Sequence, residues 1–349
     1  MTTDILYSVI VSLVPIPHNG EHDARRILEE AFSRYKNRLK SANPHVDADT
    51  NNRVDDLCNV ILSCFDYAYS GNHTKAYKIL CPELHKLSYV KPYVEAGESF
   101  YRMRLREDKV QFGYKDLMPI PDDKRYLVKT QRFSMPGLPC LYLGYHTNAC
   151  WEEMHRPPIG NCMVSRYEVI KKFQVISLEI PSYETFASDV KACIRLFPLI
   201  MACMVTVADY NDPYKSAYLI PQLIMEWLTC DEKAIHQDFK GVRFTSVHLN
   251  EQFGYPQVTF NNLALPVPGP KNHDYAKGLD ELFMLTEPTS EEYERIKNNL
   301  DEGIVDNKIF EDPMGRYSVS MFGLLERNLK DRKDFPLKEM KKRGMSFEE

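Results

Sequence analysis

The chain has 349 residues, of which 44% are hydrophobic and 27% are charged, and this composition is ordinary for a globular protein. Its length exceeds the size at which one hydrophobic core usually stops growing, so two domains are expected. The formal net charge of −5 argues against a nucleic-acid-binding protein, because proteins of that class are more often basic. The 22 prolines and 21 tyrosines argue against a helical bundle over the whole chain.

The cysteines and the apolar segments indicate the cellular compartment of the protein. The nine cysteines have irregular spacings and form no CxxC pair, which argues against a zinc site and against a disulfide framework. The apolar stretch 5–17 follows Asp4, where a signal peptide would carry a basic residue, and the run 196–208 is too short to cross a bilayer. The sequence therefore predicts a cytoplasmic protein with reduced thiols, no metal and no membrane association.

The N-terminal part of the chain has the periodicity of helices. Hydrophobic residues recur at spacings of three and four within 21–39, within 51–70 and, more briefly, within 73–87, where Pro82 breaks the pattern. We therefore predict a helical region over 1–95 that serves for dimerisation, for docking a partner or as a lid. Its apolar faces are expected to pack on the rest of the chain or on a second subunit, so that it regulates access. The alternative is an independent domain on a flexible tether.

From residue 96 the pattern changes to short strands with helices between them. Alternation over 99–105 puts Arg102 and Arg104 on one face and Tyr101 and Met103 on the other. Further strands are predicted at 138–145, 171–181, 239–249 and 255–265, and helices at 147–155, 186–207 and 215–229. This mixture predicts an α+β domain over 96–266.

The remaining segment, 267–349, is predicted to be an extension of loops and helices. Thr289 and Glu292 have the spacing of a capping box, which predicts a helix that begins there. The mixed charges of 326–344 predict a solvated helix or tail.

Common catalytic motifs are absent, since the chain contains no GxGxxG, GxxxxGK[ST], HExxH or GxSxG. Arg102 and Arg104 can hold phosphates if their strand face lines a cleft, or form surface ion pairs if that face is exposed. Arg132, beside a glycine turn, either grips a ribose or phosphate or belongs to the turn alone. Glu152 and Glu153 lie in a predicted helix, where the helix dipole favours carboxylates in any case.

Five short motifs nevertheless follow one another in order. They are FYRMR (Phe100–Arg104), RFSMPGLPCLYL (Arg132–Leu143), ACWE (Ala149–Glu152), PQLIME (Pro221–Glu226) and FKGVRFTS (Phe239–Ser246). The series resembles the RES-domain family, which is named after an arginine, a glutamate and a serine. The resemblance covers residues 98–262, a little under half of the chain, and rests on the order and spacing of the motifs together.

Three features depart from the family's pattern. Two acidic residues follow the tryptophan, and the A-x-x-E spacing favours Glu152 over Glu153 as the catalytic glutamate. The serine pair reads Thr245-Ser246, which leaves Ser246 as the match. The asparagine that the family has near the end of the domain is missing from the segment GYPQVTF.

The resemblance implies an ADP-ribosyltransferase-like mixed sheet and an enzyme that cleaves NAD⁺ at the nicotinamide–ribose bond, by hydrolysis or phosphorolysis. Such a protein would be the toxin of a toxin–antitoxin or defence system. NAD⁺ is then the substrate, and no cofactor or metal is required. The implied catalytic residues are Glu152, Arg102 and Ser246, and the implied NAD⁺-binding residues are Arg104, Arg132, Tyr142 and Gln222. Expected partners are an antitoxin or regulatory protein and a second copy of the chain.

The residue types suit this chemistry. Arginines neutralise a diphosphate, and Tyr142 can stack on nicotinamide. A carboxylate stabilises the oxocarbenium ion that develops when the glycosidic bond breaks. Two other functions remain open: ADP-ribosyl transfer to a macromolecule, and an inactive RES fold that acts as an interaction module and neither binds nor depletes NAD⁺.

Overall fold

The chain forms two compact units. The computed structural model describes residues 3–18, 20, 23–41, 46–87, 92–106, 113–248, 260–267, 279–290, 317 and 320–336. The first unit comprises Met1–Lys91, Thr130–Met135 and Ile176–Phe239, and the second comprises Pro92–Lys129, Pro136–Val175 and Lys240–Glu349. The predicted segments 1–95, 96–266 and 267–349 divide the chain differently, because residues 176–239 belong to the same unit as the N-terminal helices.

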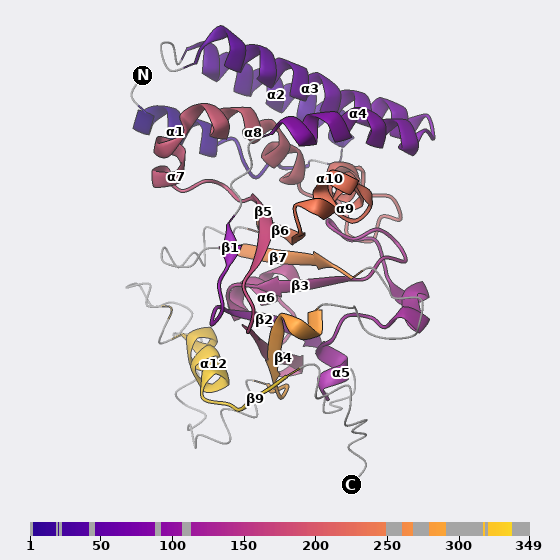
Figure 1. The fold of residues 1–349 in the computed structure, drawn as a ribbon, viewed down its shortest axis with the longest axis vertical. Coiled ribbons are helices and arrows are strands. Elements are labelled where there is room, and N and C mark those ends of the chain that lie inside the picture. The colour runs from indigo at the N-terminus through magenta and orange to yellow at the C-terminus, as the bar shows by residue number, and fades with distance from the viewer. Residues whose placement is uncertain are drawn as a thin grey trace. The chain divides into compact units, whose positions relative to one another are not determined.

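The first unit is built of helices (Figure 1). They are α1 (Thr3–Val11), α2 (Ala24–Lys40), α3 (Ala48–Tyr69), α4 (His73–Lys86), α7 (Tyr183–Ser188), α8 (Val190–Cys203), α9 (Leu219–Cys230) and α10 (Glu232–His236). The side chains of Asp23, Asp47 and Asn72 cap the first turns of α2, α3 and α4. The three helices predicted within 21–87 are therefore confirmed.

The N-terminal helices of this unit share a core with α8 and α9. Helix α3 packs on α2, α4 and α8, and α4 also packs on α9. Tyr35 of α2 is fully buried, and its hydroxyl donates to the carbonyl of Ile194 in α8 at 2.8 Å. Helix α4 continues through Pro82 to its end at Lys86, contrary to the predicted break. Buried Leu80 and Leu84 anchor it on both sides of the proline, so packing outweighs the lost hydrogen bond.

Most of the sheet belongs to the second unit (Figure 1). Its strands are β1 (Tyr93–Val94), β2 (Ser99–Leu105), β3 (Cys140–Gly144), β4 (Cys162–Val169), β5 (Phe173–Leu178), β6 (Phe239–Thr245), β7 (Asn261–Pro266), β8 (Phe283–Thr286) and β9 (Asp334–Pro336). They are hydrogen-bonded in the order β1-β5-β6-β7-β3-β2-β4-β8-β9. Strand β2 pairs antiparallel with β3 and β4, and β7 pairs antiparallel with β3 and β6.

Strand β4 was not predicted. Nearly all its residues are buried, so it lacks the alternation of apolar and polar residues that marks a strand with one solvent-exposed face. Both faces of the sheet are covered. One carries a cluster that includes Phe100 and Tyr167, and the other carries a cluster that includes Tyr101 and Met103.

The α-helices of the second unit within its described residues are α5 (Tyr114–Leu117), α6 (Thr147–Glu153) and α12 (Met321–Lys330). Helices α6 and α12 pack on each other, α6 on β2 and β3, and α12 on β4. The prediction of a solvated helix over 326–344 is wrong for the part that α12 covers, because Glu326 and Leu329 are buried. The helix predicted to begin near Thr289 lies outside the described residues.

The structure confirms the α+β class, with helices and a large sheet in one chain. In the part of the chain that the structure describes, no helix combines the length and the apolar character that a membrane span requires.

Candidate active site

The two glutamates of α6 have different environments. Consecutive helical residues point about 100° apart. The Glu152 side chain is 5% exposed, and its Oε2 accepts a hydrogen bond from Arg156 Nε at 2.8 Å. The Glu153 side chain is 35% exposed. Glu153 is therefore the carboxylate that solvent or a ligand can reach.

Glu153 is the centre of a polar cluster. Its Oε1 accepts hydrogen bonds from Ser246 Oγ at 2.5 Å and from Asn262 Nδ2 at 2.8 Å. Its Oε2 lies 3.8 Å from His248 Nε2. The Ser246 hydroxyl also accepts from the backbone N–H of His248 at 3.0 Å. Two donors thus fix one carboxylate oxygen and leave the other toward the imidazole.

Three strand ends position this cluster. Asn262, on β7, is paired with Gly144 at the end of β3 and with Phe244 on β6. The N–H of Ser246, just after β6, donates to the carbonyl of Phe260 at 2.7 Å. Helix α6 follows β3 in the chain and carries Glu153 to the ends of these strands.

Gly144 allows α6 to lie close to the sheet. A Cβ at this position would stand 2.6 Å from Cys150 Sγ and 3.4 Å from Asn262 Oδ1. The Cys150 thiol donates to the carbonyl of Tyr101 at 3.2 Å, which ties α6 to β2. Burial raises the pKa of Cys150 to about 12, so this thiol stays a donor at neutral pH.

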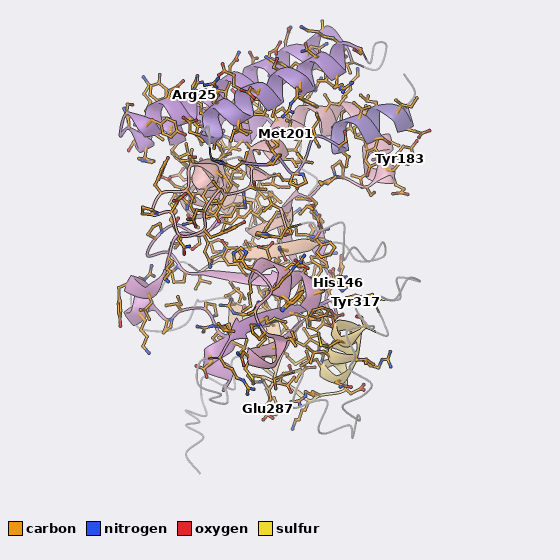
Figure 2. The ribbon with its side chains drawn as sticks, turned by 180° about the vertical axis from the view of Figure 1, so that it is seen from behind. Arg25, His146, Tyr183, Met201, Glu287 and Tyr317 are labelled. Atoms are coloured by element: carbon orange, nitrogen blue, oxygen red, sulfur yellow. The ribbon has the colours of Figure 1, made fainter. Side chains whose placement is uncertain are left out.

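A second buried group holds the start of α6. Glu326 of α12 is 8% exposed, and its Oε1 accepts hydrogen bonds from Thr147 N (2.7 Å), Thr147 Oγ1 (3.1 Å) and the Tyr317 hydroxyl (2.5 Å). Its Oε2 lies 3.5 Å from His146 Nδ1. Figure 2 shows His146 and Tyr317 side by side, and their ring centroids are 5.1 Å apart. Because His146 offers no side-chain cap to α6, the Glu326 carboxylate takes that place.

The predicted arginines of β2 do not join the Glu153 cluster. Arg102 Nη1 is 3.5 Å from the carbonyl of Tyr142 on β3, and its buried Nε has no hydrogen-bond partner among the described residues. Burial lowers the pKa of Arg102. Arg104 is exposed and donates to the carbonyl of Asp116 at 2.5 Å. Within the described ranges, neither arginine forms a hydrogen bond with Glu153.

Arg132 and Gln222 belong to the first unit, whereas Arg102, Tyr142, the α6 glutamates and Ser246 belong to the second. Arg132 is 8% exposed, and its Nη1 donates to the carbonyls of Cys203 and Val205 at 2.9 and 2.8 Å. This places a cation at the C-terminal end of α8, where the helix dipole favours it. Gln222 Nε2 donates to Thr130 Oγ1 and to the carbonyls of Gln131 and Ser134. Both side chains thus organise the 130–135 turn.

The structure therefore brings Ser246 to Glu153 and not to Glu152, the glutamate that the spacing favoured. It also adds Asn262 and His248, which the sequence reasoning did not select. The expected asparagine was sought in GYPQVTF, yet the one that reaches the glutamate follows this segment, at the start of β7. The sequence signal that could have identified Asn262 is the pair Asn261-Asn262 at the start of an apolar strand.

Comparisons with known proteins give one curated relative over most of the chain. It is the Bacillus subtilis (strain 168) protein named "Putative toxin YopC", which is 25% identical over 344 residues and is matched over 90% of this chain and 77% of its own length. No family model and no solved structure matches the chain.

Proposed function

We propose that the protein is a toxin that cleaves NAD⁺ at the nicotinamide–ribose bond and that residues 96–266 form a RES domain with an ADP-ribosyltransferase-like sheet. The ordered motifs of the sequence support the family. The name of the Bacillus subtilis relative supports the toxin role. The contact of Glu153 with Ser246 carries the proposal, because it joins the glutamate and serine motifs of that family across 93 residues of chain.

The geometry favours Glu153 as the catalytic carboxylate. An oxocarbenium ion gains most from a carboxylate that is accessible and held in place before the bond breaks. Glu153 meets both conditions, since Ser246 and Asn262 fix its Oε1 and its side chain remains partly exposed. Glu152 is buried against Arg156 instead. In this proposal Ser246 and Asn262 position Glu153 rather than react.

The reaction needs few other groups. The bond between the ribose C1′ and the nicotinamide nitrogen breaks, its electron pair leaves with neutral nicotinamide, and positive charge develops on the ribose. Water or inorganic phosphate then adds to C1′, and water loses a proton to solvent or to a nearby base. His248, 3.8 Å from Glu153, is proposed to take that proton. Half-buried Arg102 and exposed Arg104 are proposed to bind the diphosphate, and Tyr142 to contact the nicotinamide.

Incubation of the purified chain with NAD⁺, with and without inorganic phosphate, tests the proposal. Mass spectrometry of the products should show nicotinamide with ADP-ribose, or with a phosphorylated ADP-ribose when phosphate is the acceptor. Unchanged NAD⁺ together with no NAD⁺ binding in calorimetry would contradict the activity and favour an interaction module. ADP-ribose attached to a macromolecule in a cell extract would favour the transferase alternative.

The toxin role implies regulation as well as chemistry. A cytoplasmic enzyme that consumes NAD⁺ is harmful to its own cell, so we propose an antitoxin or regulatory partner that blocks it. The helical N-terminal region is proposed to regulate access, and a second copy of the chain remains a proposed partner. Growth arrest on expression, with a fall in cellular NAD⁺ that Glu153→Gln abolishes, is the expected cellular result.

A further inference from the structure

Three side chains that are typical metal ligands meet in the first unit, and none of them belongs to the Glu153 cluster. Cys81 and His85 lie four positions apart on α4, so both are on one face of the helix. Asp231 lies where α9 ends and α10 begins. Cys81 Sγ is 3.2 Å from Asp231 Oδ2, His85 Nε2 is 2.9 Å from Asp231 Oδ1, and the sulfur is 3.9 Å from the imidazole nitrogen.

These separations are those of a metal coordination shell. Zinc binds cysteine sulfur at about 2.3 Å and histidine nitrogen or carboxylate oxygen at about 2.0–2.2 Å, in a tetrahedron. Ligand atoms on such a tetrahedron are about 3.3–3.6 Å apart. The sulfur approaches Asp231 Oδ2 and the imidazole approaches Oδ1, so the two carboxylate contacts use different oxygens. Each of these separations, and that between the sulfur and the imidazole nitrogen, differs from a tetrahedral edge by about half an ångström or less. A thiol, an imidazole and a carboxylate are also a donor set that suits zinc.

Neighbouring groups hold two of the side chains in place. Asp231 Oδ1 accepts a hydrogen bond from the N–H of Ala234 at 3.0 Å, which caps α10. The His85 ring packs against Trp227, which is 1% exposed, with centroids 5.9 Å apart. All three ligand residues are half-buried, so an ion has a path from solvent. Support of this kind orients ligands before the metal arrives.

A catalytic Cys–His–Asp triad does not fit the same atoms. In a triad the imidazole uses one nitrogen for the nucleophile and the other for the carboxylate. Here His85 presents Nε2 to both Cys81 and Asp231. The ligand atoms of all three residues lie within 4.8 Å of one another, and this proximity favours a shared ion.

We propose that Cys81, His85 and Asp231 bind a divalent transition-metal ion of the zinc class and thereby tie α4 to the junction of α9 and α10. On binding, the Cys81 thiol loses its proton to solvent, and the His85 ring exchanges the Nε2 proton that faces Asp231 for one on Nδ1, so that Nε2 is free for the metal. Three protein ligands leave the fourth position for water or another ligand. The site is independent of the proposed NAD⁺ chemistry. Sequence spacing did not indicate it, because Asp231 lies 146 positions beyond His85.

The test uses the full chain after dialysis against a chelator. Titration with Co²⁺ should produce thiolate-to-cobalt absorption and the visible bands of a tetrahedral site, and Zn²⁺ should bleach them at one equivalent. Cys81→Ser and His85→Gln should each weaken the affinity at least about 100-fold. Cys230→Ser is the matched control, because Cys230 is an exposed cysteine beside Asp231 and should leave binding unchanged.

Circular dichroism and thermal unfolding in the presence of chelator establish that the variants fold. Zn²⁺ is expected to raise the Tm of the wild-type chain and of Cys230→Ser, and not that of folded Cys81→Ser. The proposal is overturned if the wild-type chain shows no saturable binding, or if Cys81→Ser and His85→Gln bind with wild-type affinity. Loss of binding in Cys230→Ser alone would place the ion elsewhere.

Discussion

Glu152 and Glu153 are neighbours in the chain, yet one carboxylate is buried in an ion pair and the other faces a polar cluster. This contrast gives a direct test at the scale of single residues. Glu153→Gln is expected to reduce NAD⁺ turnover by about 100-fold or more, because loss of a preorganised electrostatic stabiliser costs about 3 kcal/mol of the barrier. Glu152→Gln is the matched control and should keep turnover while lowering stability. The rate of NAD⁺ loss at saturating substrate is the measurement, and the opposite ranking would return the role to Glu152.

Asp47 carries an acid-sensitive contribution to stability. Its carboxylate accepts a hydrogen bond from Thr50 N at 2.8 Å, which caps α3, and another from Lys191 Nζ at 2.6 Å. Both hydrogen bonds lower the pKa of Asp47, and the one from Lys191 contributes most. A lowered pKa in the folded state stabilises the fold above the unfolded pKa of about 3.9, and this stabilisation is lost as the pH falls further. Asp47→Asn should therefore have a lower Tm than wild type at pH 7, and the difference should shrink between about pH 4 and pH 2.

Two comparisons sharpen this experiment. Lys191→Met removes the same ion pair from the other side and should show the same convergence at low pH. Asp56→Asn is the control on the same helix, because Asp56 is exposed and the described part of the chain shows no ion pair for it. The Tm of this variant should depend on pH in the same way as that of the wild type. Because the Asp47 side chain is 46% exposed, added salt should weaken its effect. A Tm difference that stays constant from pH 7 to pH 2 would show that only the helix cap matters.

At the scale of elements, the position of α6 depends on α12. Glu326→Ala would remove the side-chain acceptor of the Thr147 N–H and the close acceptor of the Tyr317 hydroxyl, while the Thr147 hydroxyl would keep the carbonyl of Phe322 at 3.3 Å. Burial and Glu326 raise the pKa of Tyr317 well above its usual value, so this hydroxyl remains a donor. We expect a loss of about 3 kcal/mol in the free energy of unfolding, measured with urea. Glu326→Gln keeps an acceptor oxygen, so it should lower the free energy of unfolding by about half as much or less. Equal losses in the two variants would show that the charge of Glu326 matters more than its hydrogen bonds.

At the scale of the whole molecule, residues 1–91 share a core with 176–239. Helices α2, α3 and α4 cover apolar faces of α8 and α9, and Tyr35 and Ile194 are joined by a buried hydrogen bond. A chain reduced to 92–349 should therefore be insoluble, or unfold without cooperativity in its 176–239 part. Co-expression of 1–91 as a separate chain should restore solubility. A soluble 92–349 with one cooperative transition would instead support an independent N-terminal domain.

Several local features of this protein follow from its amino-acid sequence alone. Spacings of three and four residues marked α2, α3 and α4, because one helix face must be buried wherever the helix lies. Alternation marked β2, and the order of five motifs directed attention to α6 and to Ser246. Residue spacing, alternation and the order of motifs can be read along the chain, and none of them requires knowledge of how the elements pack. Strand β4, buried on both faces, carries no such signal.

Tertiary structure decided what each side chain contacts. Adjacent glutamates differ only in the direction they point, and that direction depends on how Gly144, Cys150 and Glu326 seat α6 on the sheet. Arg132 is equally suited by type to a phosphate or to backbone carbonyls, and the end of α8 supplies the carbonyls. Cys81 and Asp231 meet only because α4 packs on α9. Such contacts join residues far apart in the chain, and their geometry is set by packing that no spacing records.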